Sequence, residues 1–277
     1  MTPVKPTSIS PVVKLDEVSK TFGETRALNR VSVTIHPGEF VAVIGRSGAG
    51  KTTLLRCLSR ATVASEGRIR FGEQDLAALA GRSLRQHRAR IGMIFQQFNL
   101  VRRLEVMDNV LIGRLPHVKG WRRWATLARR FPAADRAAAH RALDHVGLLA
   151  RAWQRSDTLS GGEQQRVAIA KILAQEPAVI LGDEPVASLD VANGAMVMET
   201  LRRVALEAGV TVITTLHHVD YARRYADRVL GFRQGALVFD GVPAALDDGA
   251  LEAIFGDLAP VAAPADAPLS APALALA

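Results

Sequence analysis

The chain has 277 residues, 48% of them apolar and 22% charged, which excludes a disordered or fibrous protein. Its single cysteine, Cys57, excludes an intramolecular disulfide and a CxxC metal site. The net charge of +8 is uneven: residues 82–155 hold 15 Arg and one Lys against four acids, a local +12, and the rest therefore carries 8 − 12 = −4. This distribution predicts a basic insert in a mildly acidic core.

The first elements along the chain are predicted from hydrophobic periodicity. Residues 1–10 and 259–277 are rich in Pro, Ala and Ser, so we expect loose ends there. Val31, Val33 and Ile35 alternate with polar residues, which predicts an antiparallel sheet near the N-terminus. No apolar run approaches the roughly 18–20 residues that a membrane-spanning helix needs, so none is expected.

Three further segments, residues 40–44, 178–181 and 210–216, are short and rich in β-branched side chains. Such runs are typical of strands buried on both faces of a parallel sheet. Helical spacing of apolar residues between them predicts an α/β layered core. Within the basic stretch the apolar residues also recur at helical spacing, which predicts a helical insert in that core.

A phosphate-binding loop follows the first buried strand. Residues 45–52, GRSGAGKT, fit the pattern GxxxxGK[ST] between a strand and a helix-compatible run. Glycines let backbone N–H groups turn toward phosphates, Lys51 can reach the β- and γ-phosphates, and Thr52 can offer its hydroxyl to Mg²⁺. The alternative is a glycine-rich turn that only connects two elements.

Two acids end the second buried strand, at the edge where α/β proteins bind ligands. Asp183 is suited to the Mg²⁺ shell, and Glu184 is suited to act as general base toward a water molecule. A solvated strand end with two acids is the alternative. Further along, residues 159–166, LSGGEQQR, place a serine and two glycines at a helix start, which is a second anion-binding arrangement.

This last motif resembles the signature of ATP-binding-cassette (ABC) ATPases, in which the signature of one protomer closes over the nucleotide held by its partner. The resemblance covers residues 12–245. It implies that Phe22 stacks on adenine, that Gln96 reaches Mg²⁺ and the water, and that His217, rather than His218, contacts the γ-phosphate. A metal site at the two histidines is the alternative, although no third ligand is patterned nearby.

The resemblance also defines the expected site and fold. The expected catalytic residues are Glu184, His217 and Gln96, and the expected metal ligands are Thr52, Gln96 and Asp183. The residues expected to bind nucleotide are Phe22, Gly45, Arg46, Ser47, Gly48, Ala49, Gly50, Lys51, Thr52, Thr53, Ser160, Gly161, Gly162 and Asp190. The expected fold is an α/β P-loop ATPase with a mainly parallel core, an N-terminal antiparallel region and an inserted helical subdomain.

The expected organisation is a single ATPase domain over residues 11–245. Its core comprises residues 11–96 and 166–245, and its helical insert comprises residues 97–165. Residues 246–277 are expected to form a C-terminal helix and a loose tail. Val191 stands where the family usually has proline after the D-loop, residues 188–190.

Two stretches, FQQFNLVRRLEVMDNVLIGRL and LHHVDYARRYADRVLGFRQGALVFDG, are similar to the ATP-binding subunits of bacterial phosphonate importers. Glu163 and Lys171 depart from that subfamily, which usually has Gln and Arg there. The similarity implies ATP and Mg²⁺ as cofactors and a homodimer of ATP-binding subunits. It also implies integral membrane permease subunits as partners and, indirectly, a periplasmic solute-binding protein. The implied location is peripheral, on the cytoplasmic face of the inner membrane. The alternatives are an importer of another small solute and a soluble ABC ATPase that acts on nucleic acid; we expect no nucleic-acid partner.

Overall fold

The computed structural model describes residues 12–95, 98–118 and 131–256. Two sheets form within these ranges, one with strand order β2-β1-β4-β5 and one with order β10-β9-β3-β8-β7-β6. The strands are β1 (Val13–Phe22), β2 (Thr25–Ile35), β3 (Phe40–Gly45), β4 (Glu66–Phe71), β5 (Gln74–Asp75), β6 (Ile91–Ile94), β7 (Val179–Asp183), β8 (Thr211–Leu216), β9 (Arg228–Arg233) and β10 (Ala236–Gly241). The α-helices are α1 (Lys51–Leu58), α2 (Gly81–Ala89), α3 (Val106–Ile112), α5 (Ala133–His145), α6 (Gly161–Ala174), α7 (Val191–Ala208), α8 (Val219–Tyr225) and α9 (Asp248–Phe255).

The smaller sheet is antiparallel, as the alternating pattern predicted. Val31 pairs with Val18 and Val33 pairs with Leu15, and all four side chains are buried. The larger sheet is parallel across β9, β3, β8, β7 and β6, and β10 alone joins it antiparallel. The expected mainly parallel core and N-terminal antiparallel region are therefore confirmed.

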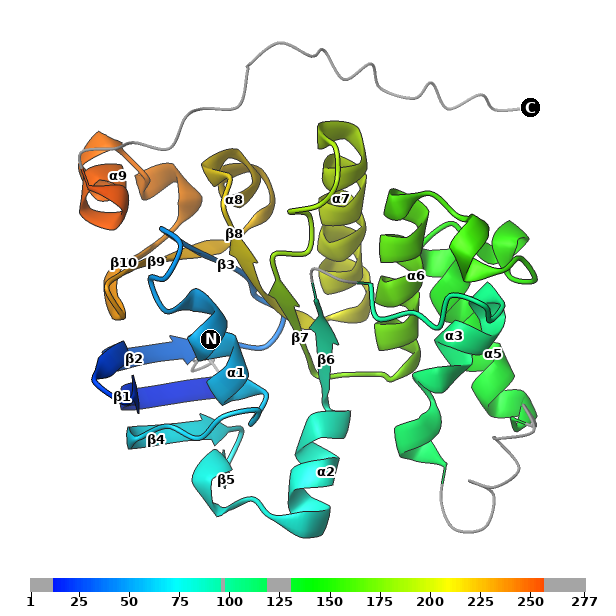
Figure 1. Ribbon diagram of the computed structural model, residues 1–277, viewed down its shortest axis with the longest axis horizontal. Helices are drawn as coiled ribbons and strands as arrows, with labels where there is room; N and C mark the ends of the chain where they lie inside the picture. Colours follow the sequence, from blue (N-terminus) through cyan, green and yellow to red (C-terminus); the bar gives the residue numbers. More distant parts are fainter. Residues whose placement is uncertain (1–11, 96–97, 119–130, 257–277) are drawn as a thin grey trace, which may run out of the picture.

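Strand β3 separates two hydrophobic cores, because successive side chains of a strand point to opposite faces. Phe40, Ala42 and Ile44 pack into the core beneath α6, α7 and α8, whereas Val41 and Val43 pack with α1 and the antiparallel sheet. Figure 1 shows this layering, with α7, α8 and α9 on one side of the central sheet and α1 between the two sheets. Burial on both faces explains why these strands read as continuous apolar runs.

The helical insert lies beside the core, where α3 and α5 both pack against α6 (Figure 1). The boundary expected at residues 165 and 166 falls inside α6, which continues without a break from the insert side into the core. The expected C-terminal helix is α9, and the tail beyond residue 256 lies outside the described residues. Among the described helices, none combines the length and the apolarity needed to cross a bilayer.

Candidate nucleotide-binding site

The phosphate loop runs from the end of β3 to the start of α1 and is pressed against neighbouring backbone. Gly45 has φ 147°, and a Cβ there would lie 2.2 Å from the carbonyl oxygen of Phe232. Gly50 has φ 104°, and a Cβ there would lie 2.4 Å from the carbonyl oxygen of Ala27. Both positions require glycine, since a side chain meets strain and a backbone clash.

Lys51 begins α1 and turns back into the loop. Its Nζ donates to the carbonyl oxygens of Gly45 (2.7 Å) and Arg46 (3.1 Å), and its side chain is almost fully buried. Burial lowers the pKa of Lys51, while the nearby carboxylates of Glu184 and Asp183 oppose that shift. The loop therefore encloses a desolvated ammonium group beside its backbone amides, an arrangement suited to phosphate.

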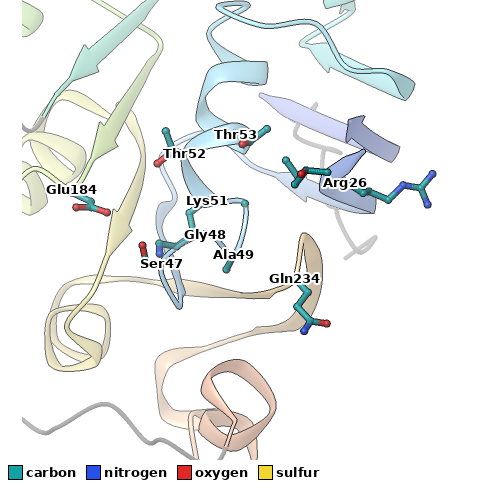
Figure 2. Close-up of a pocket in the computed structure, with 12 residues that line it drawn as sticks. Arg26, Ser47, Gly48, Ala49, Lys51, Thr52, Thr53, Glu184 and Gln234 are labelled. Carbon is teal, nitrogen blue, oxygen red and sulfur yellow. The ribbon is translucent and has the colours of Figure 1, made fainter. Parts of the chain in front are cut away.

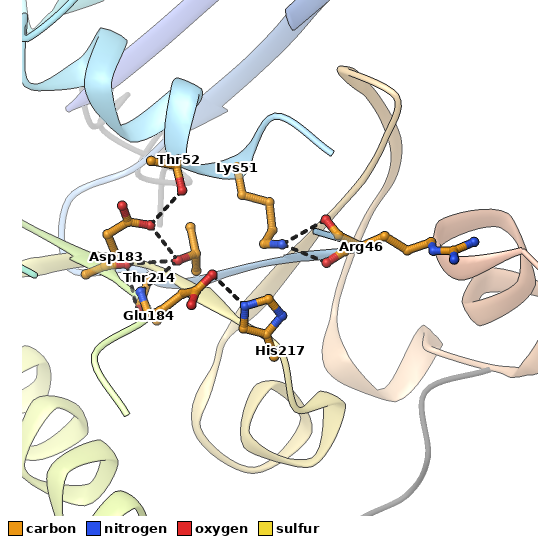
Figure 3. A network of polar contacts seen from close by, with 10 residues as sticks. Arg46, Lys51, Thr52, Asp183, Glu184, Thr214 and His217 are labelled. Carbon is orange, nitrogen blue, oxygen red and sulfur yellow. Dashed lines mark hydrogen bonds and ion pairs between the residues drawn. The ribbon is translucent and has the colours of Figure 1, made fainter. Parts of the chain in front are cut away.

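The register of the parallel strands brings the acids to the same edge as the loop. Asp183 at the end of β7 lies opposite Thr215 in β8, and Leu216 at the end of β8 lies opposite Ile44 in β3. Thr52 Oγ1 donates to Asp183 Oδ1 at 3.0 Å (Figure 3). Thr215 Oγ1 donates to the same oxygen at 3.2 Å. A hydroxyl and a carboxylate side by side are hard oxygen donors, which fit Mg²⁺.

Glu184 directly follows Asp183 and contacts His217, the first residue after β8. Its backbone has φ 53°, and its N–H donates to Thr215 Oγ1 at 2.9 Å. His217 Nε2 lies 2.5 Å from Glu184 Oε1 and donates, since the ionised carboxylate can only accept (Figure 3). His218 instead packs edge-on against Tyr221 at 5.9 Å between ring centroids. The two histidines thus have different partners.

An open pocket lies over the loop (Figure 2). Residues of the loop and of three other elements line it: Thr25, Arg26, Ala27, Ser47, Gly48, Ala49, Gly50, Lys51, Thr52, Thr53, Glu184 and Gln234. Sequence reasoning missed Thr25, Arg26, Ala27 and Gln234, because only the fold places β2 and the turn after β9 beside the loop. No motif in the sequence marks these four residues.

Three residues expected at the nucleotide do not line this pocket. Gly45 and Arg46, at the start of the loop, present carbonyl oxygens to Lys51. Phe22 lies at the end of β1, where it pairs with the pocket residue Thr25. The residue is 48% exposed, and Lys20 Nζ lies 4.8 Å from the centroid of its ring. The expected Gln96 falls outside the described residues.

The signature residues form the start of α6 and do not line the pocket either. Ser160 caps the helix: its Oγ accepts from the N–H of Glu163 at 3.3 Å and donates to Glu163 Oε2 at 3.0 Å. Gly162 lies against the start of α7, where a Cβ would be 2.3 Å from Asn193 Oδ1. Asp190 caps α7 and accepts from the N–H of Asn193 at 2.9 Å.

Comparison with known proteins assigns the family. A family model described as "ABC transporter" matches residues 28–187. The chain belongs to the ABC transporter family. The ABC fold also extends over most of the molecule: a structure of cbiO1 from Clostridium perfringens, part of the ABC transporter complex cbiONQ, has a TM-score of 0.75 at 28% identity over 84% of this chain and 89% of that one.

Two further ABC proteins bear on the site. The ATP-binding cassette MJ0796, solved as a dimer in a post-hydrolysis state bound to ADP and Pi, has a TM-score of 0.70 at 32% identity over 83% of this chain and 98% of that one. A Rhodopseudomonas palustris protein named "Phosphonates import ATP-binding protein PhnC" is 52% identical over 253 residues, covering 90% of this chain and 93% of the relative. The expected ABC fold class is therefore confirmed.

Proposed function

We propose that the chain is the ATP-binding and ATP-hydrolysing subunit of an ABC importer, and that it drives a separate membrane permease for phosphonate uptake. The observation that carries this proposal is the convergence of Lys51, the Thr52 and Asp183 oxygens, and the Glu184 and His217 pair at one sheet edge. The 52% identity to a phosphonate import ATP-binding protein supports the solute.

Each converging group has a task in ATP hydrolysis. Lys51 and the loop amides bind the β- and γ-phosphates, and Thr52 and Asp183, with Gln96 by family resemblance, hold Mg²⁺. When bound, Mg²⁺ neutralises charge on the phosphates. Glu184 accepts a proton from the attacking water, and His217 holds the Glu184 carboxylate in place from the adjacent strand.

The position of the signature supports a dimer. Ser160, Gly161 and Gly162 are absent from the lining of the chain's own pocket, although they form a helix start suited to an anion. A second copy that presents this helix start to the bound ATP completes the site, and two copies then enclose two ATP molecules. Asp190, which caps the neighbouring α7, and Phe22, beside the pocket, complete the nucleotide contacts in that dimer.

The remaining partners follow from the importer function. The permease spans the membrane and contacts the helical insert near residues 96–104, and the periplasmic solute-binding protein acts indirectly through the permease. The chain then lies peripherally on the cytoplasmic face of the inner membrane. The basic character of residues 82–155 suits a place beside an anionic leaflet.

The variant Glu184→Gln tests the catalytic assignment, because it keeps the shape of the side chain and removes the base. It is expected to bind MgATP, to accumulate as an ATP-bound dimer in size-exclusion chromatography, and to hydrolyse about 10²–10⁴-fold more slowly. Glu252→Gln, on the exposed face of α9, is the matched control and keeps the original rate. A near-normal rate in Glu184→Gln contradicts the assignment.

The solute is tested by growth. Cells that lack the gene are expected to fail on an alkylphosphonate as sole phosphorus source and to grow on inorganic phosphate. The unsubstituted gene restores growth and Glu184→Gln does not. Normal growth of the deletion strain on the phosphonate points to the alternative, an importer of another small solute.

A further inference from the structure

A buried glutamine connects the signature helix to the catalytic loop within one chain. Gln165 is fully buried in α6, and its Nε2 donates to the carbonyl oxygen of Pro185 at 2.8 Å. A carbonyl oxygen can only accept, so the amide group has to present its nitrogen on this side. Its Oε1 has no hydrogen-bond partner among the described residues. A buried polar side chain that makes one hydrogen bond and leaves its other polar atom without a partner calls for a functional reason.

Pro185 follows the catalytic carboxylate directly. Glu184 has φ 53°, in the left-handed region that favours glycine, so its backbone is strained and has to be held by its surroundings. Thr215 Oγ1 accepts from the N–H of Glu184 at 2.9 Å, and the carbonyl oxygen of Glu184 accepts from the N–H of Ala187 at 3.2 Å. The next carbonyl oxygen, that of Pro185, accepts from Gln165 Nε2. Of these three hydrogen bonds, this one comes from the signature helix α6.

The same helix begins at the signature. Ser160 caps α6, and Gln165 lies five residues further on, just over one turn into the helix. Gly162 lies so close to Asn193 that the start of α6 is also fixed against the start of α7. The helix start that serves the partner's ATP is thus joined by Gln165 to the loop that carries the chain's own base.

We propose that Gln165 is a positioning residue for Glu184, and that its hydrogen bond to Pro185 fixes the strained turn that aims the carboxylate at the attacking water. The proposal rests on the proposed ATPase function. Gln165 touches neither the pocket nor the signature serine, so its removal should slow the chemical step and leave ATP binding unchanged.

The variant Gln165→Met removes the hydrogen-bond donor to Pro185 and replaces it with an apolar side chain of similar volume. We expect kcat for ATP to fall about 10–100-fold, the loss that a displacement near 1 Å of a catalytic group produces. The KM for ATP should stay within about twofold, because no group that binds nucleotide is changed. In a Glu184→Gln background, where the base is already absent, the variant should trap as much labelled ATP in the dimer as Glu184→Gln alone.

Gln175→Met is the matched control. Gln175 lies at the other end of α6, away from the signature, and its Nε2 also donates to carbonyl oxygens, those of Ala89 (2.9 Å) and Ile91 (2.9 Å). This variant should keep the original kcat. If Gln165→Met does not fold, Gln165→Asn keeps a polar amide that is too short to reach Pro185, and the same fall in kcat is expected from it. Denaturant midpoints of all variants are measured alongside.

The proposal is overturned if a folded Gln165→Met or Gln165→Asn protein keeps the original kcat. It is also overturned if KM rises or ATP trapping is lost in proportion to kcat, since that pattern belongs to a residue that supports binding or the fold. An unsubstituted protein that neither hydrolyses nor traps ATP would instead refute the proposed function, so the two failures are distinct.

Discussion

At the scale of single residues, Glu163 stabilises the start of α6 through its carboxylate. Its carboxylate accepts from the N–H of Ser160 at 2.9 Å and from the Ser160 hydroxyl at 3.0 Å, which completes a capping box at the start of α6. The hydrogen bond from the Ser160 N–H, followed by that from its hydroxyl, holds the pKa of Glu163 below its usual range despite partial burial. Arg151 lies 3.6 Å away and favours the same ionised form.

The lowered pKa predicts a pH-dependent contribution to stability. A carboxyl with a depressed folded-state pKa stabilises the fold above its unfolded pKa of about 4.3, and this contribution is lost as the pH falls through the folded-state pKa. Glu163→Ala should therefore lower the free energy of unfolding by about 0.5–1 kcal/mol at pH 7 and by clearly less in acid. Urea unfolding at several pH values measures this, with the exposed Glu252→Ala as control. An equal loss at all pH values contradicts the explanation.

Residues at fixed spacing within one motif were predictable, whereas residues that act across elements were not. Lys51, Asp183, Glu184 and His217 were found from the sequence, and the described structure brings them to one sheet edge. Thr215 was missed although it contacts both acids, because its place opposite Asp183 depends on the register of β7 with β8. Sequence periodicity shows that a strand is buried, but it does not give the register.

At the scale of elements, a buried ion pair holds the helical insert together. Arg114, just after α3, donates to Asp135 in α5 at 2.9 Å and to the carbonyl oxygen of Ala174 at the end of α6 at 2.7 Å. The side chains of Arg114 and Asp135 are each only 10% exposed. Three helices are thus connected through one guanidinium group.

Removing one partner should be costly, because it leaves the other charge buried with fewer contacts. Asp135→Asn is expected to lower the free energy of unfolding by about 1–3 kcal/mol, because the Arg114 guanidinium keeps a second carboxylate, Glu176 Oε2, at 3.1 Å. The double variant Arg114→Met with Asp135→Leu removes both charges and should lose less than Asp135→Asn alone. Thermal or denaturant unfolding of the three proteins decides this. A double variant that is the least stable of the three would contradict the account.

Element types were predictable from hydrophobic period. The expected division between insert and core at residues 165 and 166 lies within α6, which runs from Gly161 to Ala174 and packs against α3 and α5 as well as α7. A helix that packs against both subdomains has one continuous helical pattern of apolar residues. The sequence therefore has no break that marks where the insert ends and the core begins. The same continuity is what lets Gln165 connect the signature to Glu184.

At the scale of the whole molecule, the local charge of +12 over residues 82–155 could serve either of two functions: contact with a permease and the lipid surface, or contact with nucleic acid. If the basic region contacts a permease and lipid, DNA and RNA should not stimulate ATP hydrolysis. The measurement is the ATPase rate with and without each nucleic acid at low and high salt. A strong stimulation that falls steeply with salt would favour the nucleic-acid alternative, since phosphate-driven affinity has that salt dependence.

The proposed dimer makes the most specific prediction, because each ATP site takes its phosphate loop from one chain and its signature from the other. Lys51→Ala damages the loop half and Ser160→Arg damages the signature half. In a mixed dimer one site then combines two intact halves, and the other combines two damaged halves.

Mixing the two variants in a Glu184→Gln background should therefore restore trapping of labelled ATP at one site per dimer, while each variant alone traps almost none. The reason is geometric: the described pocket contains Lys51 but none of the signature residues, and the proposed dimer brings the signature to the partner's nucleotide. A mixture of two Lys51→Ala preparations, one of them tagged, controls for exchange of chains. Normal trapping by the Ser160→Arg protein alone, with no gain on mixing, would mean that each chain completes its own site and would refute the shared-site dimer.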